Sequence, residues 1–340
     1  MRIRQSESGF SLIELIVATG LLLIVSAIVT SALLQMTQSQ TTIWNRTEMH
    51  SGIRGATELL QQEVGQAGRV SLPGTISLVN AVDAGDVQPA CDAGSPSTGA
   101  VTKSLATTSA SEVATSGIYA DPGSNAYMLL TTMDGNSQES VKVASVLSAT
   151  QITGCFTNEH AAGTVLMPLG AFANGIIPNA GVVNHSDATH LKMYGDINGD
   201  GKMVYVEYTC DIAAGNLYRQ VFSLGAAKTA PTDSDILLSN IITNPGGTAC
   251  FTYQTTADFT SPCCTVQGTF FNFVLDVAVT LTVETEEIDP ITRQHEQETK
   301  ALLNVSPRNI FNAFQMVGNS YTDHIQSTPA SVTALLAEVT

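Results

Sequence analysis

Residues 15–34 read LIVATGLLLIVSAIVTSALL, twenty consecutive residues without a charged side chain. As an α-helix, at 1.5 Å per residue, this run is about 30 Å long, which matches the hydrocarbon thickness of a membrane. Arg2 and Arg4 precede the run, and positive charge on that side holds the N-terminus in the cytoplasm. The stretch therefore predicts a membrane-spanning helix, with the remainder of the chain on the far side of the membrane.

A cleaved secretory signal peptide is the alternative interpretation of such an N-terminal segment. Signal peptides have an apolar core of about 7–15 residues that ends in a cleavage site of small residues. Here the apolar run is longer, and the helical pattern continues past Ala27 and Ser31 without a turn signal. The length of the run favours a helix that is retained.

A simple membrane anchor does not explain why a carboxylate, that of Glu14, lies at the start of the apolar run. An unpaired carboxylate beside an apolar run is costly unless a cation accompanies it, and the next basic residue along the chain is Arg46. The cation is therefore expected from another chain or from a newly made amino terminus. The string Gly9-Phe10-Ser11-Leu12-Ile13-Glu14 resembles the prepilin cleavage motif, which is shared by type IV pilins and by the pseudopilins of type II secretion systems.

The resemblance implies that prepilin peptidase cuts after Gly9 and that Phe10 becomes an N-methylated first residue. It also implies that Glu14 neutralises the amino terminus of a neighbouring subunit in a filament. Burial of a carboxylate or an ammonium group between apolar helices is costly unless the two groups form an ion pair with each other. The implied fold class is α+β, a type IV pilin fold with a long N-terminal helix packed on an antiparallel β-sheet domain.

The helical pattern continues beyond the membrane as an amphipathic stripe. Apolar residues recur at three- and four-residue steps, namely Ile43, Met49, Ile53, Ala56, Leu60, Val64 and Ala67. Pro73-Gly74 is expected to end the pattern, which predicts a helix over residues 10–69 about 90 Å long. The predicted segments are a leader (1–9), a membrane and filament-core half-helix (10–34), an amphipathic half-helix (35–69) and an exported β-rich domain (70–340).

Short antiparallel strands separated by Gly, Pro and Asn turns are predicted for the exported domain, and one sheet is their expected assembly. The strands are expected at residues 126–133, 140–146, 192–194, 203–210, 217–224, 270–284 and 299–305. Residues 83–125, rich in small and polar side chains, are expected to form a long surface excursion with short strands.

Two further stretches resemble particular subfamilies of pilin-like proteins. Residues 54–68, RGATELLQQEVGQAG, look like the second half of the first helix in PilW-type minor pilins and in J-type pseudopilins. The strand pair 272–284 and 295–305, followed by Ser306-Pro307-Arg308-Asn309, again looks like PilW-type proteins.

Residues 196–207 read DINGDGKMVYVE and match the calcium-loop pattern D-x-[DN]-x-[DN]-G-x₅-E. The pattern assigns Ca²⁺ ligands to the side chains of Asp196, Asn198, Asp200 and Glu207 and to the backbone carbonyl of Lys202. A tight Asn-Gly-Asp-Gly hairpin turn explains most of the same residues, because the flanking residues have strand pattern. A calcium loop and a metal-free hairpin both stay open.

Cysteine content agrees with export from the cytoplasm. The six cysteines all lie in the expected exported domain, at Cys91, Cys155, Cys210, Cys250, Cys263 and Cys264. Disulfides are the expected state of cysteines in an oxidising compartment, and six cysteines allow 15 complete pairings. Zinc is the weaker alternative, because the sequence has no CxxC spacing.

Charge composition argues against a nucleic-acid-binding protein, and the absence of common catalytic motifs argues against an enzyme. The net charge of −16 and the absence of a Lys/Arg cluster speak against nucleic acid as a partner. The sequence has no G-x-S-x-G, H-E-x-x-H or phosphate-loop motif, so an enzyme is not expected.

These observations and resemblances together predict a minor pilin. It would be a single-pass inner-membrane protein with a periplasmic domain that enters an extracellular type IV pilus and primes assembly or contacts surfaces. Its expected partners are prepilin peptidase, other major and minor pilins, and the inner membrane before assembly. The alternatives are a J-type pseudopilin of a type II secretion system and a membrane-tethered binding module that never polymerises.

Overall fold

The computed structural model describes residue 9 and residues 11–88, 99–177, 182–258, 265–266, 269–270 and 272–337. The chain divides into two compact units. Unit 1 contains the chain up to residue 52 together with residues 284–298, and unit 2 contains residues 53–283 and the chain from residue 299 onward.

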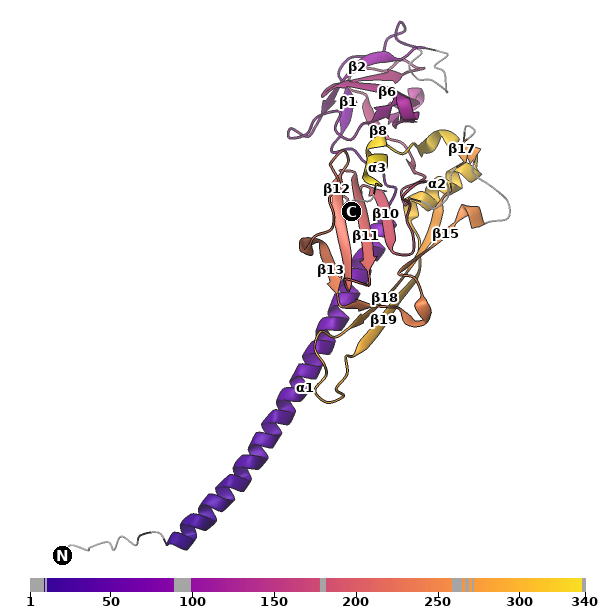
Figure 1. Ribbon diagram of the computed structural model, residues 1–340. Coiled ribbons are helices and arrows are strands. Elements are labelled where there is room, and N and C mark those ends of the chain that lie inside the picture. The colour runs from indigo at the N-terminus through magenta and orange to yellow at the C-terminus, as the bar shows by residue number, and fades with distance from the viewer. Residues whose placement is uncertain are drawn as a thin grey trace, which may run out of the picture. The chain divides into compact units, whose positions relative to one another are not determined.

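The first helix, α1 (Leu12–Gln66), is continuous over 55 residues, or about 82 Å (Figure 1). It ends before Pro73-Gly74, because Gly68 adopts a φ of +78° and its N–H donates to the carbonyl of Tyr194 at 2.9 Å. A Cβ at position 68 would lie 2.9 Å from the side chain of Ile310 and 3.0 Å from the carbonyl oxygen of Phe172. The predicted helix end at residue 69 is therefore corrected to Gln66, with Gly68 as the cause.

Within unit 1, residues 284–298 bind to the middle of α1 through polar side-chain contacts. The guanidinium of Arg46 lies 2.5 Å from the carboxylate of Glu296, and His50 contacts the carboxylate of Glu298. Thr42 adds a hydrogen bond to the carboxylate of Asp289. These polar contacts connect segments that are far apart in the sequence.

Unit 2 contains a closed antiparallel barrel of six short strands. In barrel order they are β1 (Ile76–Leu78), β2 (Val101–Thr107), β7 (Gln151–Cys155), β6 (Ser140–Ser148), β5 (Leu129–Thr132) and β8 (Val165–Pro168). Buried side chains of these strands, including Ile76, Leu105, Leu130 and Ile152, share one apolar core. Because β2 pairs with both β1 and β7, the expectation of a surface excursion over residues 83–125 is wrong for this strand.

A second sheet of unit 2 has the order β10-β11-β12-β13. Its strands are β10 (His190–Gly195), β11 (Val204–Asp211), β12 (Asn216–Ser223) and β13 (Ile236–Ser239). The part of α1 that belongs to unit 2 buries the predicted apolar residues Ile53, Ala56, Leu60 and Val64, and Ala67, directly after the helix, is buried as well. Ile43, which the same pattern placed in the stripe, is 65% exposed.

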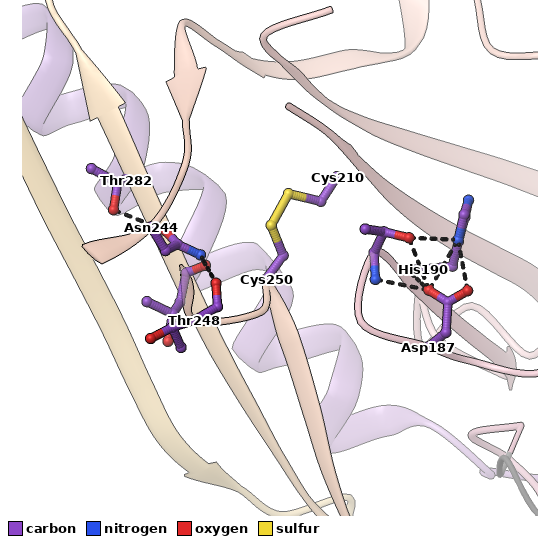
Figure 2. Close-up of a disulfide and its surroundings, with 9 residues drawn as sticks. Asp187, His190, Cys210, Asn244, Thr248, Cys250 and Thr282 are labelled. Carbon is purple, nitrogen blue, oxygen red and sulfur yellow. Dashed lines mark hydrogen bonds and ion pairs between the residues drawn. A yellow bond between two sulfur atoms is a disulfide. The ribbon is translucent and has the colours of Figure 1, made fainter. Parts of the chain in front are cut away.

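The third sheet centres on β18 (Val274–Glu284), which pairs with β14 (Ile241–Ile242), β15 (Phe251–Thr255) and β19 (Gln297–Val305). A disulfide between Cys210 at the end of β11 and Cys250 just before β15 connects the second and third sheets (Figure 2). Asn244 binds the carbonyls of Thr248 and Thr280 and accepts a hydrogen bond from the Thr282 hydroxyl. The strands of each sheet are held together by their own hydrogen bonds, and the disulfide adds a covalent link between the two sheets.

The C-terminal segment joins the barrel to the rest of unit 2. Helix α2 (Arg308–Gly318) is followed by β20 (Ile325–Gln326), which pairs in parallel with β9 (Ala171–Phe172), and by helix α3 (Ala330–Leu335). The side-chain amide of Gln326 donates to the carbonyls of Leu129 and Leu169 beside the barrel strands. The remaining short strands are β3 (Ala120–Asp121), β4 (Ala126–Tyr127), β16 (Thr265–Val266) and β17 (Thr269–Phe270).

The antiparallel character of the predicted β-rich domain is confirmed, but its strands do not form one sheet. Five predicted strands correspond to β6, β10, β11, β12 and β19, whereas residues 126–133 are split into β4 and β5, and Phe270 belongs to β17 rather than to β18. The strands are divided among a barrel and separate sheets. A long N-terminal apolar helix combined with antiparallel sheets fits an α+β, pilin-like fold.

Candidate functional sites

The start of α1 is fixed by a capping box. The hydroxyl of Ser11 accepts a hydrogen bond from the N–H of Ile13 at 3.2 Å, and the carboxylate of Glu14 accepts one from the N–H of Ser11 at 3.1 Å. Gly9 lies outside the helix and is exposed. Phe10, the predicted first residue of the processed chain, lies outside the described residues. Glu14 therefore supports the N-terminus of its own helix in the single chain.

The first part of α1 presents an apolar surface on every side. Between Leu12 and Met36, each large apolar side chain is at least 51% exposed. In the described part of the chain, α1 is the one helix long and apolar enough to cross a membrane, by length and composition, and its most apolar stretch is not buried. An uncovered apolar surface of this size indicates contact with lipid or with other protein chains.

Residues 4–30 match a family model, the prokaryotic N-terminal methylation motif. The match includes Gly9, Phe10 and Glu14 and extends into the apolar helix. It supports a type IV pilin-like protein of the pilin and pseudopilin class, which implies processing by prepilin peptidase and pilin-type assembly partners. Together with the apolar helix, the motif fits a membrane-anchored protein. No curated protein and no solved structure matches the chain.

The predicted calcium loop is the connection between β10 and β11. Gly195 and Val204 are the last paired residues, so Asp196, Asn198, Asp200 and Lys202 all lie in the loop. Gly199 and Gly201 have φ values of +72° and +82°, conformations that glycine adopts without strain. The structure thus brings four of the five predicted ligands into one short loop.

Asp196 is the most deeply buried of these residues, with a fully covered side chain. Its Oδ2 atom accepts a hydrogen bond from the N–H of Gly201 at 3.3 Å and lies 3.6 Å from the Nε atom of Arg69. Its Oδ1 atom has no hydrogen-bond partner in the described part of the chain. Sequence reasoning missed Arg69, because nothing in the local pattern of residue 69 points to a loop so far along the chain.

Glu207, the fifth predicted ligand, lies apart from the others in β11, opposite Lys192. Its carboxylate accepts a hydrogen bond from the hydroxyl of Tyr205 at 2.6 Å and forms a 2.7 Å ion pair with the Nζ atom of Lys228. Both side chains of the ion pair are nearly buried. The negative charge of Glu207 is therefore neutralised within unit 2 by Lys228, which the motif did not indicate.

Solvent reaches the loop from two sides. Asp200, Gly201 and Lys202 line a cavity of about 500 Å³, and Asn198 and Gly199 line a separate groove beside the last turns of α1. Within the described residues, no group of three or more His, Cys, Asp or Glu side chains is placed to hold a metal ion. Any metal at this loop would therefore depend on two aspartates, on Asn198 and on backbone oxygen.

Among the described cysteines, Cys210 and Cys250 form one disulfide, and Cys155 is also disulfide-bonded. The expectation of disulfides is confirmed for these residues. Cys91, Cys263 and Cys264 lie outside the described residues, so the predicted separation of Cys263 and Cys264 into different disulfides stays a prediction.

Proposed function

We propose that this chain is a minor pilin of a type IV pilus. It is cleaved after Gly9, methylated at Phe10 and held in the inner membrane by a single pass of α1 with its β-rich part in the periplasm. It then moves into the extracellular filament, where it primes assembly or contacts surfaces. This role is structural rather than catalytic.

The observation that carries the proposal is the position of Glu14 within a helix of exposed apolar side chains. In the described part of the chain its carboxylate receives one hydrogen bond, from the N–H of Ser11. A carboxylate has room for further donors, and a cation is the partner that makes it tolerable among packed apolar helices. The amino terminus made by cleavage after Gly9 is such a cation, and every subunit of a filament supplies one.

The choice of a minor pilin rests on the PilW-type resemblance and on the size of the exported part. Unit 2 combines a barrel with two further multi-stranded sheets, so it offers much more surface than one small sheet would. A subunit that begins a filament or occupies its tip has room for such a domain, because one side of it is not covered by a following subunit.

Substitution of Glu14 tests the proposal. Glu14→Gln keeps an acceptor for the Ser11 N–H, since Gln also completes a capping box, but it removes the charge. We expect the variant to accumulate in the membrane at the normal level and to decrease at least tenfold in sheared filaments. Glu48→Gln, an exposed glutamate farther along α1, is the matched control and should enter filaments normally. Normal incorporation of Glu14→Gln would contradict the proposal.

Two other outcomes identify the alternatives. Loss of secreted proteins from the medium, with pili unchanged, after deletion of the gene would indicate a J-type pseudopilin. Absence of the chain from every filament, combined with an unprocessed Met1 in mass spectrometry, would indicate a tethered module that does not polymerise. N-methylated Phe10 at the mature amino terminus is the result that the proposal requires.

A further inference from the structure

The β10–β11 loop contains a buried carboxylate oxygen whose charge is only partly compensated. Asp196 has no exposed side-chain surface, and its Oδ1 atom lacks a partner in the described residues. Burial of an anionic oxygen without a hydrogen bond or a cation is unfavourable. This buried, unpartnered oxygen is a second observation, beside the sequence pattern, that points to a cation-binding role for Asp196.

The orientation of the Asp196 carboxylate places it within the loop. Its Oδ2 atom is held by the N–H of Gly201, five residues later, so the loop closes around the carboxylate. The Nε atom of Arg69 approaches this same Oδ2 atom at 3.6 Å, beyond hydrogen-bond distance, and the Arg69 side chain is 45% exposed. Arg69 therefore lowers the cost of the buried charge but does not provide a ligand for Oδ1.

The loop also supplies further oxygen atoms of the kind that Ca²⁺ prefers. The Oδ1 atom of Asp200 accepts the N–H of Lys202 at 3.0 Å, which leaves its Oδ2 atom for another partner. Asn198 offers a side-chain carbonyl and Lys202 a backbone carbonyl, and Ca²⁺ binds six to eight such oxygens with variable geometry. The Nζ atom of Lys202 lies 2.8 Å from the carboxylate of Glu112, so its positive charge is directed to that acid.

The geometry points to a weak calcium site, which we propose is formed by Asp196, Asn198, Asp200 and the carbonyl of Lys202, with water completing the shell and Glu207 not taking part. Glu207 is excluded because Lys228 and Tyr205 already hold its carboxylate. Loss of the bidentate glutamate and proximity of Arg69 both weaken binding. The expected Kd is on the order of 10⁻⁴–10⁻³ M, the range of extracellular calcium modules. The inference does not depend on the proposed role in filaments.

Calorimetric titration of the full chain in detergent micelles, after removal of metal with a chelator, tests the site. We expect about one Ca²⁺ per chain with the affinity above, a rise in Tm of a few degrees at 10 mM CaCl₂, and no comparable rise with MgCl₂. Asp200→Ala should weaken binding at least tenfold. Asp233→Ala, an exposed aspartate outside the loop, is the control and should bind as the unsubstituted chain does.

Two further variants separate a calcium site from a metal-free hairpin turn. Arg69→Gln should tighten calcium binding several-fold, because it removes a positive charge 3.6 Å from a ligand carboxylate. Glu207→Gln should leave the affinity of the folded chain within about twofold, and circular dichroism confirms that the chain is folded. Absence of binding in both the unsubstituted chain and Arg69→Gln would overturn the proposal, and a tenfold loss in Glu207→Gln would overturn the ligand set.

Discussion

Glu63 on α1 and Arg219 on β12 form an ion pair across 156 positions of sequence, with the Nε atom of Arg219 3.1 Å from the Oε1 atom of Glu63. The hydroxyl of Tyr208 donates to the Oε2 atom of the same carboxylate at 2.6 Å. Burial, together with the adjacent Glu63 charge, raises the pKa of Tyr208 well above its ordinary value, so the hydroxyl remains a donor at alkaline pH. This network fixes the end of α1 against two strands of the second sheet.

Removal of Glu63 should therefore destabilise unit 2. We expect Glu63→Ala to lower the free energy of unfolding by about 2–4 kcal/mol, because it leaves Arg219 partly buried without its partner. Urea unfolding of the full chain in micelles, followed by circular dichroism, measures the change. Glu58→Ala breaks an exposed pair with Arg54 on the same helix and should change stability by less than about 0.5 kcal/mol. Equal effects of the two substitutions would contradict this explanation.

Two glycines near the end of α1 should respond in opposite directions to the same substitution. Gly68→Ala should cost about 1–3 kcal/mol, because residue 68 has a positive φ and its Cβ would meet the carbonyl of Phe172. Gly65→Ala should stabilise by about 0.5–1 kcal/mol, because residue 65 is helical and a Cβ there would meet no atom within 4 Å. Thermal unfolding of both variants compares them, and a stabilised Gly68→Ala would show that residue 68 does not end the helix.

His160 should make the stability of the barrel depend on pH. Its ring lies between the carboxylates of Asp134 and Glu139, at 2.5 and 2.7 Å, and is fully buried. Burial lowers the pKa of His160, but the hydrogen bonds and charges of the two acids outweigh burial and raise it above 6.5. The ion pairs then stabilise fully below pH 6.5, and stability is lost as the pH rises through the raised pKa.

The measurement for His160 is the Tm of the full chain between pH 5.5 and 8.5. We expect the Tm to fall toward high pH, and we expect His160→Gln to reduce that slope. His185→Gln is the control, because the His185 ring contacts a backbone carbonyl rather than an acid. An unchanged slope in His160→Gln would assign the pH dependence to other groups.

The Cys210–Cys250 disulfide should contribute substantially to stability. It closes a loop with a sequence separation of 40, for which the chain-entropy relation gives about 4 kcal/mol. Replacing both cysteines by serine should therefore lower the urea midpoint markedly. The double variant should also lose less stability than the unsubstituted chain when a reducing agent is added. A double variant as stable as the unsubstituted chain would show that the disulfide is not needed to hold the second and third sheets together.

The sequence predicts local pattern well and distant pairing poorly. The stripe from Ile53 to Ala67 was predictable, because its period is set by the helix and its burial by an adjacent sheet. The barrel was not, because β1 has only three residues and its neighbours in the barrel, β2 and β8, are distant in sequence. Short strands carry too few alternating positions to show their period.

The same division applies to the candidate sites. The methylation motif and the Asp196 loop are contiguous, so their residue types and spacing were visible in the sequence. Two cations come from other elements: Arg69 lies close to the loop carboxylate of Asp196, and Lys228 pairs with Glu207 in β11. Their effects are electrostatic and are not visible in the motif. The exclusion of Glu207 from the ligand set could therefore be seen only in the folded chain.

The capping box of Ser11 and Glu14 would also affect the energetics of joining the proposed filament. Because the Ser11 N–H occupies one oxygen of the Glu14 carboxylate, an incoming amine can approach the other oxygen while the helix end stays intact. Docking of a neighbour then adds a bond without first breaking one, and the acceptor is already ordered before the neighbour arrives. In the proposed filament, joining would then require little local rearrangement at the helix end, which would favour rapid addition of subunits.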